Sequence, residues 1–252
     1  MTEDLIIERD GDIGHVTFDR PAQRNALTFE MYEALAAYCD DPGDVRAIVI
    51  SGAGGAFAAG TDMTQFRAFE TPEDGWAYEE NMDKVMSRIE QCPVPTIAAI
   101  TGACTGGGAA IAACCDLRIT DDRLKFGFPI ARTLGNCLSI ASLARLSALI
   151  GQAKVREVIF TSRLVGADEA LAAGLVMQIT SDPVARAIEL AAQIAEYAPL
   201  TLRVTKEGLR RLRTEGAGAD DKDLVKTAYM SEDFKEGMEA FLGKRKPVFK
   251  GR

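Results

Sequence analysis

Three consecutive glycines, residues 106–108, stand between a strand-like segment, residues 94–100, and an uncharged apolar run, residues 109–115. This order predicts a strand, a glycine turn and a buried helix. The first backbone N–H groups of a helix have no acceptor within the helix, and they point outward from its N-terminus. Such groups stabilise a negatively charged oxygen without any charged side chain. The sequence therefore contains a candidate oxyanion site.

A second glycine-bearing segment lies about 40 residues earlier. Ala59, Gly60 and Thr61 follow a glycine-rich loop and precede Asp62. Because glycine lacks a Cβ, the backbone of such a segment can come close to a ligand. Glycines also permit tight packing with no ligand involved. A ligand-binding role requires that the N–H groups face a cavity, whereas a packing role does not.

The hydrophobic pattern predicts the elements that carry these turns. Residues 5–9 and 14–19 alternate as a hairpin, and residues 47–51 and 94–100 indicate buried strands. Further strands are expected at residues 117–120, 124–128 and 175–179. Helices are expected after the N-cap Thr28 and over residues 74–91, 138–149 (ended by Gly151), 153–160, 167–173, 184–196, 200–212, 221–230 and 231–242.

Strands with intervening helices dominate the first part of the chain, and helices dominate the last part. The predicted class is α/β with a helical C-terminal region. We place the boundary near Asp182 and Pro183, which divides the chain into residues 1–182 and 183–252.

Composition limits the partners. The chain has 252 residues and a formal net charge of −8, which argues against nucleic acid or an anionic membrane as a partner, because both attract a basic face. Its apolar runs are far shorter than the roughly 20 residues of a membrane span. The charged N-terminal segment does not resemble a signal peptide. The six cysteines form no C-x-x-C pair, so we expect free thiols in the cytoplasm and no metal site.

The two glycine segments together resemble the crotonase (enoyl-CoA hydratase/isomerase) superfamily. The resemblance rests on residues 54–63 (GGAFAAGTDM), 102–108 (GACTGGG) and 115–116 (CD), and it is supported by residues 20–27, 95–100, 126–129, 172–176 and 236–246. It implies a spiral of ββα units with a helical C-terminal region for trimerisation and a lid, in homotrimers or dimers of trimers. It also implies an acyl-CoA substrate whose thioester enolate is held by the backbone N–H groups of Thr61 and Gly107.

The same resemblance assigns substrate contacts. It places Gln23 and Arg24 near the adenine and phosphates of CoA, and Phe241 and Lys244 in the lid. Residues beside the oxyanion turns would also contact the substrate: Ala59, Gly60, Asp62, Met63 and Gly106. Coenzyme A enters as part of the substrate, and no separate cofactor is expected.

The carboxylates that this family uses are missing. The resemblance places the two hydratase glutamates at Ala110 and Ile130, and a third acidic position near Leu138. Hydration of a conjugated thioester needs a base near the water and an acid near the α-carbon. Ordinary two-glutamate hydration is therefore not expected, although the chain resembles hydratases and isomerases. The alternatives are decarboxylation, C–C bond hydrolysis, thioester hydrolysis, or binding of acyl-CoA without turnover.

Other residues offer polar groups for the site. Glu79, Glu80 and Asp83 share a helix that borders the acyl pocket in the family, or they form a solvated helix face. Arg132 and Asn136, with Cys137, lie in a segment expected to line the pocket, where they would hold a carboxylate or a water, or pack behind the site. The single histidine, His15, lies in the first hairpin, where a structural role is expected.

Overall fold

The computed structural model describes residues 2–252, which build two sheets. The larger has the order β1-β2-β3-β4-β6-β8; only β1 and β2 are antiparallel, and the other neighbours are parallel. β5 and β7 form a small parallel sheet. The strands are β1 (Leu5–Asp10), β2 (Ile13–Phe18), β3 (Ala47–Gly52), β4 (Thr96–Ile100), β5 (Ala103–Thr105), β6 (Leu117–Thr120), β7 (Lys125–Gly127) and β8 (Gln178–Ile179).

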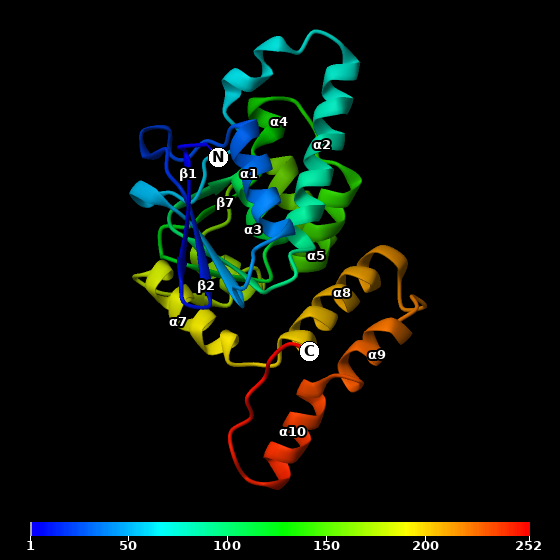
Figure 1. Cartoon of the computed structure of the whole chain (residues 1–252). Helices are drawn as coiled ribbons and strands as arrows, with labels where there is room; N and C mark the ends of the chain where they lie inside the picture. Colours follow the sequence, from blue (N-terminus) through cyan, green and yellow to red (C-terminus); the bar gives the residue numbers. More distant parts are fainter. Residues whose placement is uncertain (1) are drawn as a thin grey trace.

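Helices cover both faces of the larger sheet and extend beyond it (Figure 1). The α-helices are α1 (Phe29–Asp40), α2 (Pro72–Glu90), α3 (Gly107–Cys114), α4 (Ile130–Thr133), α5 (Ile140–Thr161), α6 (Ala167–Ala172), α7 (Pro183–Ala195), α8 (Pro199–Glu215), α9 (Lys222–Tyr229) and α10 (Glu232–Leu242). Short 3-10 turns occur at Pro21–Gln23, Ala53–Gly55 and Met63–Ala68.

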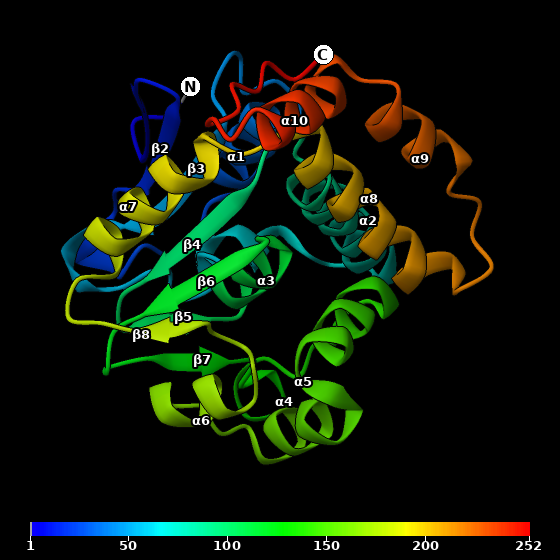
Figure 2. The ribbon, with the colours of Figure 1, turned by 90° about the horizontal axis from the view of Figure 1, so that it is seen from below.

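The core has two layers because strand residues alternate between the two faces of the sheet. Ile48 and Ile50 of β3 face a large cluster with α1, α2 and α3, whereas Val49 faces a smaller cluster with Ala187 and Ala191 of α7. α7 packs against β2, β3, β4 and β6, and Figure 2 shows it in front of β2 and β3. The central strands are thus buried on both faces, which explains their continuous apolar sequences.

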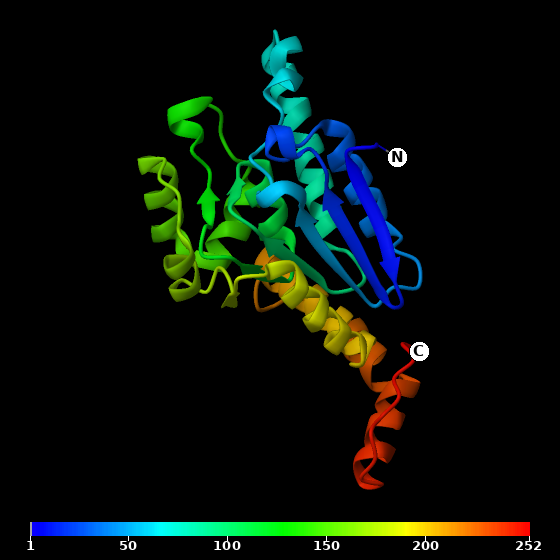
Figure 3. The same ribbon diagram turned by 90° about the vertical axis from the view of Figure 1, so that its left-hand side faces the viewer.

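The last three helices leave this core. In Figures 1 and 3, α9 and α10 project away from the sheets, and α8 connects them to the core. α7 belongs to the packed core, although it follows Pro183. Many large apolar side chains of the projecting part are exposed, among them Leu209, Tyr229, Met230, Phe241 and Leu242.

The α/β class and most element positions are confirmed. The helix expected from residue 138 begins at Ile140, because Ser139 caps it through a hydrogen bond from the N–H of Ser142. Gly151 breaks this helix as expected, with φ +73° and ψ 150°, and the chain continues helically to Thr161. The strand expected over residues 175–179 forms only at Gln178–Ile179. β5, α4 and the turn at Met63–Ala68 had no sequence signal, since they are short and depend on distant neighbours.

Candidate active site

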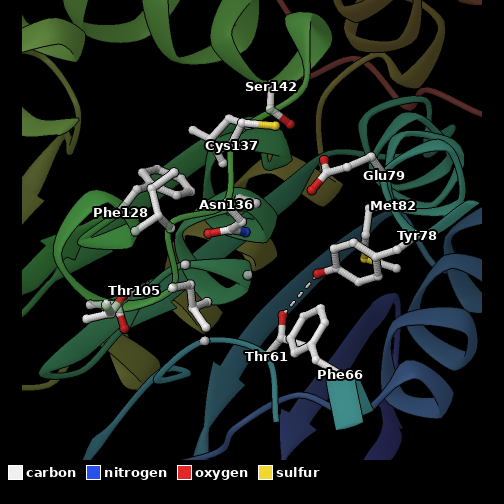
Figure 4. Close-up of a pocket in the computed structure, with 18 of the residues that line it drawn as sticks. Thr61, Phe66, Tyr78, Glu79, Met82, Thr105, Phe128, Asn136, Cys137 and Ser142 are labelled. Atoms are coloured by element: carbon white, nitrogen blue, oxygen red, sulfur yellow. Dashed lines mark hydrogen bonds between the residues drawn. The ribbon is translucent and has the colours of Figure 1, made fainter. Parts of the chain in front are cut away.

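A cavity of about 360 Å³ opens between α2, the chain that follows β3, and the segment between β7 and α5 (Figure 4). Its wall is mostly apolar, and both glycine turns contribute to it. The lining residues are Tyr32, Ala59, Gly60, Thr61, Met63, Phe66, Tyr78, Glu79, Met82, Met86, Thr105, Gly106, Gly107, Ala110, Phe128, Pro129, Ile130, Thr133, Leu134, Asn136, Cys137, Leu138 and Ser142.

The backbone at Thr61 is oriented by the segment around Leu27. The N–H of Leu27 donates to the carbonyl of Gly60, and the N–H of Asp62 donates to the carbonyl of Leu27, both at 2.8 Å. Backbone groups alternate in direction along an extended chain, so the N–H of Thr61 points to the opposite side. Thr61 lines the cavity, and within residues 2–252 its N–H donates to no backbone carbonyl.

Gly107 is the first residue of α3, where backbone N–H groups have no acceptor inside the helix. The N–H of Gly106 donates to the carbonyl of Gly127, and the carbonyl of Gly106 accepts from the N–H of Ala110, both at 2.9 Å. These bonds fix the turn. In the part of the chain that the structure describes, the N–H of Gly107 has no backbone acceptor and borders the cavity.

The two turns are in contact. A Cβ built on Gly106, whose φ is +53°, would lie 3.4 Å from the Cα of Gly60. A Cβ built on Gly107 would lie 3.1 Å from Oγ1 of Thr61. The absence of side chains at these glycines therefore lets the two free N–H groups border one cavity.

Three hydroxyl groups follow one another beside these turns. The Tyr32 hydroxyl lies 2.9 Å from Oγ1 of Thr61. The same Oγ1 lies 3.4 Å from the Tyr78 hydroxyl, a contact that Figure 4 shows as a dashed line. Burial raises the pKa of both phenols above the usual tyrosine value. Both phenols are therefore neutral near pH 7 and can donate hydrogen bonds.

One carboxylate also borders the cavity. Glu79 on α2 projects toward Asn136 across the cavity in Figure 4. Burial raises its pKa above the usual glutamate value, and the neighbouring charge of Asp83 raises it further. Glu80 instead pairs with Lys84 at 2.8 Å on the exposed face. The carboxylate of Asp83 accepts a hydrogen bond from the Ser139 hydroxyl at 2.5 Å.

Comparison with known proteins identifies the family and the fold of this chain. Residues 8–252 match the model of the enoyl-CoA hydratase/isomerase family. A "Probable enoyl-CoA hydratase" of Bacillus subtilis is 38% identical over 90% of this chain and 91% of its own length. A "Short-chain-enoyl-CoA hydratase" of Clostridium acetobutylicum is 33% identical over 96% of this chain and 95% of its own length.

Solved structures agree with this family match. The structure of an enoyl-CoA hydratase/carnithine racemase from Magnetospirillum magneticum superposes with a TM-score of 0.90, at 33% identity, over 100% of this chain and 97% of that chain. The chain belongs to the enoyl-CoA hydratase/isomerase family. The family resemblance expected from the two glycine segments is thereby confirmed.

The family resemblance predicts carboxylates at three positions. In this chain the residues at these positions border the cavity but carry no acid group. Ala110 lies one helical turn into α3, Ile130 begins α4, and Leu138 precedes α5. Ala110, Ile130 and Leu138 therefore supply neither an acid nor a base to the cavity. Glu79, from another element, is the charged side chain among the described residues that line the cavity.

The other expected site residues differ in whether they line the cavity. Asn136 and Cys137 line the cavity with Ala59, Gly60, Met63 and Gly106. Arg132 lies on the exposed side of α4, outside the cavity wall. A four-residue helix turns its third residue away from the face that carries Ile130.

Asp62 has a visible structural role. It caps the turn at Met63–Ala68 by accepting a hydrogen bond from the N–H of Thr64 at 3.0 Å, and it pairs with Arg20 at 3.0 Å. The hydrogen bonds from Thr64 are the main cause of its lowered pKa. Asp62 does not line the cavity, and it holds the chain beyond Thr61 in place.

The residues expected to contact CoA lie at different distances from the cavity. Arg24 is exposed, but its carbonyl accepts from the N–H of Ala59 at 3.0 Å, so the turn that carries Gln23 and Arg24 adjoins the cavity wall. Phe241 and Lys244 lie at the end of α10, which projects far from α2 and α4 in Figure 1. Within one chain they do not reach the cavity.

His15 lies away from the site, on β2, where its Nε2 lies 2.9 Å from Oγ of Ser51. Across residues 2–252, no group of three or more His, Cys, Asp or Glu side chains is placed to hold a metal ion. Among the same residues, no helix is both long and apolar enough to span a membrane. The six cysteines are free, and five of them are buried.

Sequence reasoning missed the two tyrosines. Neither Tyr32, which is fully buried, nor Tyr78 was among the expected site residues, although both line the cavity. The partner of each phenol is Thr61, which is 29 residues from Tyr32 and 17 from Tyr78. Local periodicity contains no information on such contacts.

Proposed function

We propose that this chain binds an acyl-CoA thioester in the cavity and stabilises its enolate between the N–H groups of Thr61 and Gly107. The observation that supports this proposal is the position of the two groups: both border one cavity, and neither has a backbone acceptor in residues 2–252. Each such donor contributes about 3 kcal/mol to an anionic transition state.

The rest of the cavity suits an acyl chain. Met82, Met86, Phe128 and Leu138 supply an apolar wall, which favours a hydrocarbon chain over a charged one. The phenols of Tyr32 and Tyr78 fix the hydroxyl of Thr61, and the bonds of Asp62 and Leu27 fix its backbone. An oxyanion site that is rigid before substrate arrives needs little reorganisation during the reaction.

The charge pattern disfavours ordinary hydration. One carboxylate lines the cavity, whereas addition of water to a conjugated thioester uses a base for the water and an acid for carbon. Decarboxylation, C–C bond hydrolysis and thioester hydrolysis remain reactions that an enolate or oxyanion site can support. Binding without turnover is the remaining alternative.

The enolate site is tested with a β-ketoacyl-CoA, which gains strong ultraviolet absorbance when it ionises to its enolate. We expect this absorbance to appear on binding, at a pH where the free thioester is mostly neutral. The thioether analogue, which lacks the carbonyl, serves as the matched ligand and should bind at least about tenfold more weakly. Equal affinity for the two ligands, with no enolate absorbance, contradicts the proposal.

Turnover is tested separately with crotonyl-CoA, a malonyl-type CoA, a β-ketoacyl-CoA and a saturated acyl-CoA. Loss of each substrate is followed by chromatography. Hydration of crotonyl-CoA at a rate typical of an enzyme contradicts our inference about the missing carboxylates. Tight binding of all four with no reaction supports the alternative of binding without turnover.

We further propose a homotrimer, or a dimer of trimers, in the cytoplasm. The exposed apolar residues of α8 to α10, including Leu212, Phe241 and Leu242, support a subunit contact. Phe241 and Lys244 would then reach the CoA of a neighbouring subunit. Sedimentation equilibrium tests this proposal, and a monomer at micromolar concentration contradicts it. The free thiols are consistent with a reducing compartment.

A further inference from the structure

Glu79 is a carboxylate without a partner in an apolar cavity. Across residues 2–252 it has neither a hydrogen bond nor a cation beside it, and its surroundings act on it through burial and the charge of Asp83. The nearest lining residues on its own helix are Tyr78, Met82 and Met86. A half-buried carboxylate that is left unpaired carries a desolvation cost, and such groups are concentrated at functional sites.

The neighbouring acids on α2 differ from Glu79. Glu80 is exposed and paired with Lys84, and Asp83 is hydrogen-bonded to Ser139 at the start of α5. Residues four apart on a helix share a face, so Glu79 and Asp83 point to the same side. The Asp83 carboxylate is held by the Ser139 hydroxyl. The Glu79 carboxylate has no such partner among the described residues and can exchange a proton with a ligand.

The position of Glu79 relative to the oxyanion turns is fixed by Tyr78. The Tyr78 hydroxyl lies 3.4 Å from Oγ1 of Thr61, and its ring packs against Phe66 at 5.0 Å and Phe29 at 5.6 Å between centroids. These contacts hold α2 against the loop that carries Thr61. Glu79, the next residue along α2, is therefore held beside the place where a thioester would lie. Figure 4 shows the Glu79 carboxylate directed into the cavity.

We propose that Glu79 is the catalytic residue that carries a proton from and to the carbon chain of the bound thioester; the proposal rests on the function proposed above. The Cα–H bond of the substrate breaks, its proton passes to the Glu79 carboxylate, and its electron pair moves to the thioester oxygen. The neutral Glu79 then returns the proton to carbon as the enolate collapses. No other reactant is consumed.

One carboxylate is sufficient for moving a double bond and insufficient for adding water by the two-carboxylate route. In a β,γ-unsaturated acyl-CoA, the enolate extends to the γ-carbon, and return of the proton there yields the conjugated α,β-unsaturated thioester. Of the two reactions in the family name, hydration and isomerisation, a single carboxylate at Glu79 therefore fits isomerisation of a β,γ-unsaturated acyl-CoA. The apolar wall and the single acid of the cavity favour this isomerisation.

The experiment compares wild type with Glu79→Gln and with Glu80→Gln, its matched neighbour on the exposed face. Two rates are measured: incorporation of deuterium from D₂O into the α-position of a saturated acyl-CoA, by mass spectrometry, and conjugation of a 3-enoyl-CoA, by absorbance. We expect Glu79→Gln to lower both by about 10²- to 10⁴-fold. We expect Glu80→Gln to match wild type, and Glu79→Asp to give intermediate rates.

Binding of the saturated acyl-CoA is measured by calorimetry for each variant. We expect a dissociation constant within a few-fold of wild type for Glu79→Gln, which also shows that the variant is folded. Unchanged rates in Glu79→Gln, or a wild type that forms the enolate yet exchanges no proton, overturn the assignment of Glu79 and leave the proposed function standing. Failure of wild type to bind any acyl-CoA overturns the proposed function itself.

Discussion

The phenol oxygen of Tyr32 occupies the space where a side chain of Gly107 would begin. A Cβ built on Gly107 would overlap this oxygen and would lie 2.9 Å from Cζ of the same ring. Tyr32 is 1% exposed and is packed in the core, so it cannot move aside freely. The first residue of α3 is thus glycine because a buried tyrosine touches it, in addition to any need of a ligand.

This contact predicts the effect of Gly107→Ala. The variant should lose about 1–3 kcal/mol of unfolding free energy, because a methyl group is forced into a filled space. It should also weaken enolate binding, because the N–H of Gly107 shifts with the turn. Urea denaturation and the enolate absorbance measure the two effects. Adding Tyr32→Phe removes the overlapping oxygen and should restore part of the stability; no restoration would contradict the assigned contact.

Thr61→Ala tests the hydroxyl chain separately from the backbone donor. The variant keeps its N–H, so the enolate absorbance should persist. The buried hydroxyl of Tyr32 loses its hydrogen-bond partner, which should cost about 1–2 kcal/mol of unfolding free energy. Thr61→Ser keeps the hydroxyl and is the matched control, with stability closer to wild type. Loss of enolate binding in Thr61→Ala but not in Thr61→Ser would show that the side chain, not the N–H, contacts the oxyanion.

The raised pKa of Glu79 predicts how stability depends on pH. At a pH below the pKa of an unfolded glutamate, both states hold the proton, and wild type and Glu79→Gln differ least. As pH rises through the higher pKa of the folded state, the unfolded chain releases its proton first, so wild type loses stability relative to the variant. At pH about 7, Glu79→Gln should be the more stable protein.

The control for this prediction is Glu80→Gln. A hydrogen bond from Lys84 lowers the pKa of Glu80, so its charged form favours folding and the sign is reversed. Urea denaturation of the three proteins at several pH values measures both trends. A stability difference between wild type and Glu79→Gln that does not change with pH would contradict the burial of Glu79.

Glu90 joins three helices and should be sensitive to substitution. Its carboxylate accepts from Nε of Arg145 on α5 at 3.0 Å and from Arg213 on α8 at 2.5 Å, and the Arg145 side chain is 5% exposed. Glu90→Gln leaves a buried guanidinium without its counter-charge, at a cost of about 3 kcal/mol. Lys84→Gln, which breaks an exposed pair on the same helix, should leave the urea midpoint unchanged.

The sequence showed where the reactive backbone would be, because glycine turns and buried strands are local patterns. The sequence alone predicts Gly60, Thr61, Gly106 and Gly107 beside a common site, and the family resemblance rests on the segments that carry them. The three apolar residues at the usual carboxylate positions, Ala110, Ile130 and Leu138, were also evident from sequence. Their side chains do border the cavity.

The choice among the acids of α2 came only from the tertiary structure. Helical periodicity places Glu79, Glu80 and Asp83 on a helix but does not say which element faces each of them. The contact of Tyr78 with Thr61 and the hydrogen bond from Ser139 to Asp83 decide that Glu79 borders the cavity. These contacts join residues 17 and 56 positions apart in the chain. Sequence patterns extend over a few turns, whereas a site is defined by surfaces that meet only after folding.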